Sequence, residues 1–210
     1  LSPDTESIAR AAKLLLEAKN PAILAGGGVM LSRAADELVA LAEQAGIPVA
    51  TTHMAHGSFP NEHPLSVGVL GDCSANGRGR VANSIVGEAD AVLLIGTRAD
   101  GATTRGWSIP SPQSTIIQIG IDPQHIGSNL RIDLGIVADA RLAIVAIRKF
   151  LSEYDDGSLS ERRKNREGAV RKLMDSWKHD FEPEMVTDQK PIRSSRALKE
   201  LQNVIDNDTL

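Results

Sequence analysis

The chain has 210 residues, a formal net charge of −4 at pH 7 and a single cysteine. Its length suits one substantial core or one domain with an extension, because domains typically contain about 100–200 residues. A net negative charge argues against a surface that neutralises many phosphates, so we expect no nucleic-acid partner. The apolar runs are far shorter than the ~20 residues that span a bilayer, so we expect no membrane partner. One cysteine excludes an intrachain disulfide and suits a reducing compartment, which predicts a cytoplasmic protein.

The first third of the chain predicts a helix, a buried strand and a glycine loop. Ser2-Pro3-Asp4 has the capping residues of a helix start. The apolar run over 21–25 predicts a strand that leads directly into Gly26-Gly27-Gly28, where backbone N–H groups can approach a ligand. Ser32 is expected to cap a helix over 33–45, whose apolar residues recur at helical spacing.

The chain then continues with further strands and helices. We expect a strand over 47–51, a long loop over 52–68, a helix over 78–87, strands over 91–95, 115–121 and 133–137, and an amphipathic helix over 140–151. Strands that alternate with helices predict right-handed crossovers and a doubly wound parallel sheet.

The composition changes after residue 151, where charged residues dominate. We expect a peripheral helix over 158–181, whose basic run 162–166 forms a solvated face, and one further helix over 194–205. This divides the chain into a main domain over 1–151, a charged helical linker over 152–190 and a last segment over 191–210. The chain stops where another strand is expected, which suggests a fragment of a larger protein.

Candidate ligand-binding residues follow the predicted strands. In an open parallel sheet the ligand crevice lies beyond the carboxyl ends of the strands. There Arg98 can pair with a phosphate, and Asp122 or Asp139 can accept hydrogen bonds from a ribose hydroxyl or an adenine amine. An alternative stays open, in which the glycines make tight turns and the acids cap helices. The run Gly26-Gly27-Gly28-Val29-Met30-Leu31 also lacks the last glycine of the dinucleotide fingerprint G-x-G-x-x-G, because Leu31 occupies that position.

The sequence predicts no metal site and no catalytic residue. His53, His56 and His63 lie close together, but no cysteine pair or H-E-x-x-H pattern accompanies them. Cys73 is read as a small loop residue, because nothing in the sequence indicates a lowered thiol pKa.

Five phrases of the sequence resemble the central domain of thiamine diphosphate-dependent enzymes, in the acetolactate synthase-like branch. They occur in the order of that family and together cover about residues 1–151, while 191–210 resembles the helix that opens the next, diphosphate-binding domain. The phrases are Asn20–Val29, Ala45–Val49, Gly57–Gly68, Ala89–Arg98 and Ile119–Asn129.

The resemblance implies an α/β fold with a doubly wound, mostly parallel six-stranded sheet flanked by helices, of the NAD/FAD-binding type, with a helical C-terminal extension. It implies a lyase or transferase that acts on 2-keto acids by C–C bond cleavage or carboligation. Thiamine diphosphate and Mg²⁺ would be bound by flanking domains that this chain lacks, so the fragment alone would be inactive. The partners would be those flanking domains and further subunits, in a homodimer or homotetramer.

The resemblance also implies a groove that holds FAD, ADP or no ligand. Position by position, it places Gly26, Gly27 and Gly28 at the diphosphate or ribose, Thr51 and Thr52 beside a flavin, Gly96 and Arg98 along the groove, and Asp122 and Asp139 at the adenosine end. This chain departs from FAD-binding members at 72–74, where they carry a histidine, and at 98–102, where they carry a second arginine. Alternatives are a stand-alone module that binds NAD, FAD or ADP, of sirtuin-like or electron-transfer flavoprotein-like type, and a non-catalytic scaffold domain.

Overall fold

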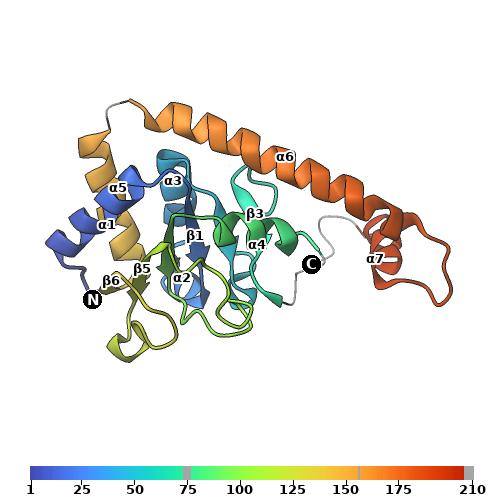
Figure 1. The fold of residues 1–210 in the computed structure, drawn as a ribbon, viewed down its shortest axis with the longest axis horizontal. Coiled ribbons are helices and arrows are strands. Elements are labelled where there is room, and N and C mark those ends of the chain that lie inside the picture. The colour runs from blue at the N-terminus through green and yellow to red at the C-terminus, as the bar shows by residue number, and fades with distance from the viewer. Residues whose placement is uncertain (73–76, 156, 206–210) are drawn as a thin grey trace.

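The computed structural model describes residues 1–72, 77–155 and 157–205. A six-stranded sheet forms its centre, and every strand pairs in parallel with its neighbours in the order β3-β2-β1-β4-β5-β6 (Figure 1). This confirms the predicted doubly wound α/β fold. The strands are β1 (Pro21–Ala25), β2 (Val49–Thr51), β3 (Ser66–Val69), β4 (Ala91–Ile95), β5 (Thr115–Gly120) and β6 (Leu134–Val137).

Helices cover both faces of the sheet and extend beyond it at the C-terminal end (Figure 1). None of those in the described ranges is long and apolar enough to cross a membrane. They are α1 (Thr5–Glu17), α2 (Gly27–Leu31), α3 (Ala35–Ala45), α4 (Gly79–Gly87), α5 (Ala140–Tyr154), α6 (Leu159–Val186) and α7 (Ser194–Gln202), with 3-10 turns η1 (His53–Ala55) and η3 (Pro123–His125).

Two hydrophobic cores explain why the strands are apolar without alternation. In β1, Ile23 and Ala25 belong to the core formed with α1, α3 and α5. Their neighbours Ala22 and Leu24 belong to the opposite core, which includes residues of α4 and α6. Successive side chains of a strand point to opposite faces, so a strand covered on both faces is apolar throughout. Because all the strands are parallel, their carboxyl ends form one edge on which a site can be built.

The structure corrects two of the expected elements. The long loop expected over 52–68 contains β3, which pairs with β2 across a register shift at Val49/Ala50. Four residues that include a glycine give too short an apolar signal for a strand. The glycine loop is also shorter than expected, because its second glycine begins α2.

The expected helix caps are also corrected. Ala34, rather than Ser32, precedes α3 and makes no side-chain capping bond. Ser32 ends α2 instead, and its hydroxyl donates a 2.8 Å hydrogen bond to Oδ2 of Asp139. At the start of α1 the cap is Asp4, whose carboxylate accepts from the Ser7 amide at 2.8 Å. Asp4 thus takes the capping role at α1, whereas α3 begins without a side-chain cap.

The glycine loop after β1 packs directly against the loop after β4. The amide of Gly26 donates to the carbonyl of Ile95 at 2.8 Å, and the amide of Gly28 donates to the carbonyl of Gly96 at 2.9 Å. A Cβ on Gly28 would lie 2.6 Å from the Cα of Gly96, which itself has a positive φ of 62°. A Cβ on Gly27 would meet nothing closer than Met54 at 3.9 Å. Two of the three glycines are therefore explained by backbone packing.

Alanine at neighbouring glycines should have opposite effects on stability. We expect Gly28→Ala to lower the free energy of unfolding by about 1–3 kcal/mol, because the new methyl group overpacks the contact with Gly96. Gly27→Ala should leave it unchanged or raise it by up to about 1 kcal/mol, since alanine favours a helix more than glycine does. Urea unfolding of both variants checks this. Equal losses at the two positions would show that the β1–β4 contact does not select the glycine.

Helix α6 is docked on the domain by arginines of its first turns. Arg162 donates to the carbonyl of Leu16 at 2.7 Å, at the end of α1. Arg166 donates to the carbonyls of Gly46 at 3.0 Å and Lys19 at 2.9 Å, just before β2 and β1. Cations suit helix C-termini, where backbone carbonyls lack partners. The expectation of a solvated basic face was therefore wrong for these arginines, and α6 crosses the amino edge of the sheet.

Burial has a measurable consequence for Arg166. It lowers the pKa of its guanidinium to about 10, and the neighbouring charge of Arg162 acts in the same direction, while Asp90 opposes the shift. The guanidinium stays charged at neutral pH.

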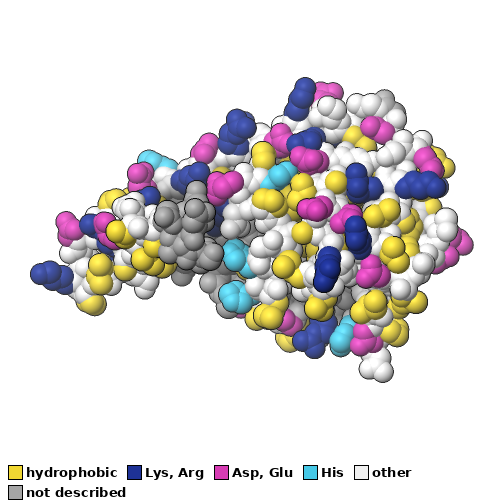
Figure 2. Space-filling model, turned by 180° about the vertical axis from the view of Figure 1, so that it is seen from behind, with side chains coloured by type: hydrophobic (Ala, Val, Ile, Leu, Met, Phe, Trp, Pro, Cys, Tyr) yellow, Lys and Arg dark blue, Asp and Glu magenta, His cyan; other side chains and the backbone are white. Residues whose placement is uncertain are grey.

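Further along α6, Val170 and Met174 are buried in the core that contains α4. On the face shown in Figure 2, basic and acidic side chains are interspersed rather than gathered by sign.

Removing the half-buried Arg166 should destabilise the chain, whereas removing its exposed neighbour Lys164 should not. Arg166→Met leaves the carbonyls of Gly46 and Lys19 without this donor, so we expect the free energy of unfolding to fall by about 1–3 kcal/mol. Lys164→Met, on the exposed side of the same helix, serves as the control and should change it by less than about 0.5 kcal/mol. Similar losses in urea titrations of both variants would contradict the docking role.

Candidate functional site

A cavity of about 370 Å³ lies at the carboxyl ends of β1, β4, β5 and β6. It spans the position where the strand order reverses, between β1 and β4, which is the usual ligand crevice of such sheets. Five of the predicted site residues line it, namely Gly28, Gly96, Arg98, Asp122 and Asp139. The strands and the tight β1–β4 contact thus bring together residues that are far apart in the sequence.

The other predicted site residues lie outside this cavity. Gly26 and Gly27 belong to the β1–β4 contact and to the start of α2. Thr51 and Thr52 are each only 6% exposed. The amide of Thr52 donates to the carbonyl of Ala25 at 2.8 Å. That any of the predicted residues binds a cofactor stays a prediction.

Asp139 combines a helix cap with a place in the cavity wall. Its Oδ1 accepts from the amide of Leu142 at 3.1 Å and caps α5, while its Oδ2 accepts from the Ser32 hydroxyl. Burial raises the pKa of the Asp139 carboxyl, but the hydrogen bonds from the Leu142 amide and the Ser32 hydroxyl lower it more, so the net shift is downward. The carboxylate is therefore ionised at neutral pH and keeps lone pairs for a ligand.

Asp122 organises a turn on the opposite wall. Its Oδ1 accepts from the amide of Gln124 at 2.9 Å and caps the 3-10 turn η3, and its Oδ2 lies 3.4 Å from Nδ1 of His125. The predicted role of acids as caps is thus present at both Asp122 and Asp139, together with a place in the cavity.

Arg98 is the basic side chain that lines the cavity. It is exposed, and within the described ranges its guanidinium makes no ion pair or side-chain hydrogen bond. An unpaired guanidinium offers five N–H donors in a planar fork that matches a phosphate or carboxylate. Apolar side chains complete the cavity, among them Leu31, Ile121 and Ile126. The arrangement suits a ligand with an anionic group, hydroxyl donors and a flat apolar part.

A buried amide joins the two sides of the cavity. Gln118 lies in the middle of β5 and is 3% exposed. Its Nε2 donates to the carbonyls of Thr97 at 3.1 Å and His125 at 3.2 Å, and its Oε1 accepts from the amide of Gly127 at 2.7 Å. The side chain consequently connects the loop after β4 with the turn after β5.

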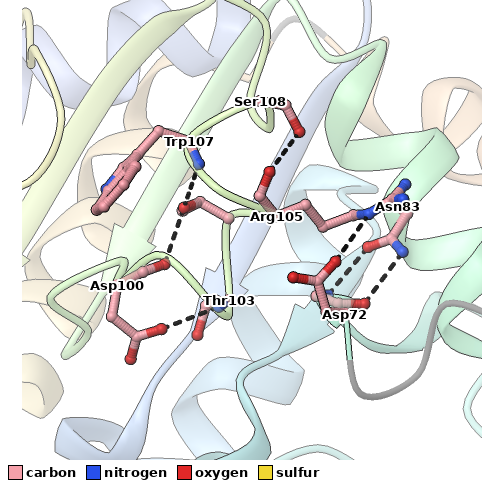
Figure 3. A network of polar contacts seen from close by, with 9 residues as sticks. Asp72, Asn83, Asp100, Thr103, Arg105, Trp107 and Ser108 are labelled. Carbon is pink, nitrogen blue, oxygen red and sulfur yellow. Dashed lines mark hydrogen bonds and ion pairs between the residues drawn. The ribbon is translucent and has the colours of Figure 1, made fainter.

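The other half of the crevice, beside β3, is occupied by protein. The loop after β4 reaches the end of β3, where the amide of Asp72 donates to the carbonyl of Ala102 at 3.1 Å. Arg105 forms an ion pair with Asp72 at 3.2 Å (Figure 3). Asn83, from α4, accepts a hydrogen bond from the amide of Gly71 and donates one to its carbonyl (Figure 3). Thr104 is completely buried in the same loop.

The histidines do not form a metal site. His63 lies 3.4 Å from Glu43 through Nε2, and its Nδ1 accepts from the amide of Leu65 at 3.1 Å. Arg163 also forms an ion pair with Glu43, in which Nη2 lies 3.0 Å from Oε1. Across the described part of the chain, no group of three or more His, Cys, Asp or Glu side chains could hold a metal ion. These residues therefore offer no donor set for Mg²⁺, and Cys73 lies outside the described residues.

Several cavity residues were not predicted from the sequence. Gln118 had a signal, because a polar residue interrupts the apolar run Thr115–Gly120. The apolar wall residues had none, since exposed and buried positions look alike in an irregular turn. The unpredicted residues include Leu31, Ser32, Gln118, Ile121, His125 and Ile126.

Comparisons with known proteins agree with this architecture. The sequence model of the family described as thiamine pyrophosphate enzyme, central domain, matches residues 8–147. The chain is 38% identical over 199 residues to a probable acetolactate synthase large subunit of Methanocaldococcus jannaschii, covering 95% of this chain and 32% of that protein. It is 40% identical over 142 residues to a sulfoacetaldehyde acetyltransferase of Rhodobacter capsulatus, covering 66% of this chain and 23% of that protein.

A solved structure shows the same fold. The crystal structure of benzoylformate decarboxylase from Polynucleobacter necessarius has a TM-score of 0.55 at 22% identity, covering 71% of this chain and 28% of that one. The chain thus spans about a third of the length of the first curated relatives that it matches. From the family match over 8–147, this chain belongs to the central domains of thiamine pyrophosphate enzymes.

Proposed function

We propose that this chain is the central domain of an acetolactate synthase-like enzyme that acts on 2-keto acids by C–C bond cleavage or carboligation. The similarity to an acetolactate synthase large subunit over 95% of the chain supports this proposal. Thiamine diphosphate and Mg²⁺ would be held by flanking domains, since the described residues provide no donor set for the metal. The enzyme would be cytoplasmic and would work as a homodimer or homotetramer.

Within that enzyme, the cavity at the strand ends would bind a nucleotide. The observation that carries this proposal is the combination of an unpaired guanidinium at Arg98 with the two carboxylates of Asp122 and Asp139 around one cavity. Arg98 would bind a phosphate, and a carboxylate would accept from ribose hydroxyls. The apolar side chains of Ile121 and Ile126 would pack against the base. Pockets of this kind combine apolar walls with a few placed polar groups.

The size of the cavity favours ADP, or the ADP part of a larger ligand, over an entire FAD. Its 370 Å³ lies near the lower end of ligand pockets, which range from ~300 to 1,000 Å³. A flavin that continued toward β3 would meet the loop held by the Arg105–Asp72 ion pair. FAD, NAD and an empty groove are therefore the alternatives that binding experiments decide.

Loss of the Arg98 guanidinium should weaken nucleotide binding selectively. We expect Arg98→Ala to raise the dissociation constant of ADP by about tenfold to a hundredfold, because a charge-assisted hydrogen bond contributes about 1.5–3 kcal/mol. Arg131→Ala is the control, since this side chain is 90% exposed and lies outside the cavity. Calorimetric titrations with ADP, FAD and NAD measure the effect. Flat titrations of the unsubstituted protein with all three would overturn the nucleotide proposal and favour a scaffold role.

The catalytic proposal requires the full-length protein. With Mg²⁺ and thiamine diphosphate present, we expect it to consume pyruvate, which is measured by loss of the keto acid. A parallel assay offers sulfoacetaldehyde, because a sulfoacetaldehyde acetyltransferase is among the similar proteins. Absence of activity on any 2-keto acid or acyloin, with the cofactor demonstrably bound, would contradict the proposal.

A further inference from the structure

Gln118 is a polar residue within the apolar part of β5. Its neighbours Ile117 and Ile119 are completely buried, and Gln118 itself is 3% exposed. A buried amide must satisfy its hydrogen bonds within the protein, since an unsatisfied buried polar group destabilises the folded state. An apolar residue at this position would avoid that requirement. The polar side chain therefore points to a role in the arrangement of its partners.

Its partners are the two segments that form opposite walls of the cavity. Thr97 immediately precedes Arg98 in the loop after β4, while His125 and Gly127 belong to the turn that Asp122 caps. Only a primary amide can donate to two carbonyls and also accept from an amide at this site. Glutamate could not donate to the carbonyls when ionised, and methionine of similar length would make none of the three bonds.

A second side chain joins the same two segments near the solvent. Nδ2 of Asn129 donates to the carbonyl of Arg98 at 2.9 Å. Gly127, whose φ is +71°, turns the chain between the two attachments. The loop that carries Arg98 is consequently fixed to the turn from a buried side and from an exposed side. The distance between the guanidinium and the Asp122 turn depends on these bonds.

We propose that Gln118 is a positioning residue for the nucleotide cavity, which holds the Arg98 loop at the correct distance from the 122–127 turn. This inference rests on the proposed nucleotide-binding function and adds a residue to it that need not touch the ligand. The simpler alternative is a buried glutamine that contributes to stability alone. A suitable control separates the two, because both alternatives predict a less stable variant.

Gln44 supplies that control. Its Nε2 donates to the carbonyl of Arg148 at 3.0 Å and to the Ser152 hydroxyl at 2.8 Å, and its Oε1 accepts from Nε of Arg148 at 3.3 Å. It thus makes the same number of hydrogen bonds as Gln118. These bonds join α3 to α5 and lie outside the cavity lining.

The experiment compares Gln118→Met with Gln44→Met in the full-length protein. We expect Gln118→Met to raise the dissociation constant of ADP by about tenfold or more, and Gln44→Met to leave it within about twofold, although both lower stability. Hydrogen exchange provides a reading that does not depend on the ligand. The Gly127 amide, and also the Ala99 amide of the Arg98 loop, which donates to Thr97 rather than to Gln118, should exchange faster in Gln118→Met alone. Equal ADP affinities in the two variants, or unchanged exchange at Gly127, would overturn the positioning role.

Two further outcomes distinguish a failure of the positioning role from a failure of the nucleotide proposal. If the unsubstituted protein does not bind ADP, the nucleotide proposal fails, and exchange at the Ala99 amide, which makes no bond to Gln118, decides whether Gln118 positions the Arg98 loop. If Gln118→Met does not fold, Gln118→Glu replaces it, because the carboxylate still accepts from the Gly127 amide but repels the carbonyls of Thr97 and His125. Protection at Gly127 together with weakened ADP binding supports the role in that variant. Unchanged binding contradicts it.

Discussion

The site depends on a direct backbone contact between the loops that leave β1 and β4. Gly28 and Gly96 meet there without side chains, and the amide of one donates to the carbonyl of the other. This contact lies where the strand order of the sheet reverses. It therefore fixes the positions of the two loops at the base of the cavity. The glycine loop therefore serves the fold first. Of its three glycines, only Gly27 has room for a side chain.

The two edges of the sheet are held by different chemistry. At the amino edge, the arginines of α6 donate partly buried hydrogen bonds to the carbonyls at the ends of α1 and α3. At the carboxyl edge, the amide side chain of Gln118 connects two loops by hydrogen bonds, while the guanidinium of Arg98 stays unpaired. The first arrangement stabilises the domain. The second leaves hydrogen-bonding capacity for a ligand, which is the usual division between a scaffold and its loops.

The elements that could be predicted from the sequence are those whose residues follow a local pattern. Strands β1 and β4 are apolar without alternation because both faces are covered, and α5 has a regular amphipathic stripe. The predicted bounds of these elements therefore lie close to the observed ones. Strand β3 was not found, because its pairing depends on the adjacent β2 rather than on its own four residues. Among the site residues, Arg98 and Asp139 follow from the rule that ligands lie at strand ends. The docking of Arg166 and the partners of Gln118 depend on contacts between distant segments, which no local pattern encodes.

The docking of α6 separates two boundaries that are usually treated as one. The family match ends at residue 147, before α6 begins, whereas the buried side chains of Val170 and Met174 belong to a core of the domain. A segment that ended with the family match would leave the carbonyls at the ends of α1 and α3 without their cationic partners and would uncover an apolar strip beside α4. The residues that pack into this core therefore extend beyond the family match, and the similarity to the acetolactate synthase large subunit of Methanocaldococcus jannaschii likewise covers 95% of the chain. Because one side of α6 makes these contacts, substitutions on its opposite side leave the docking of the helix intact.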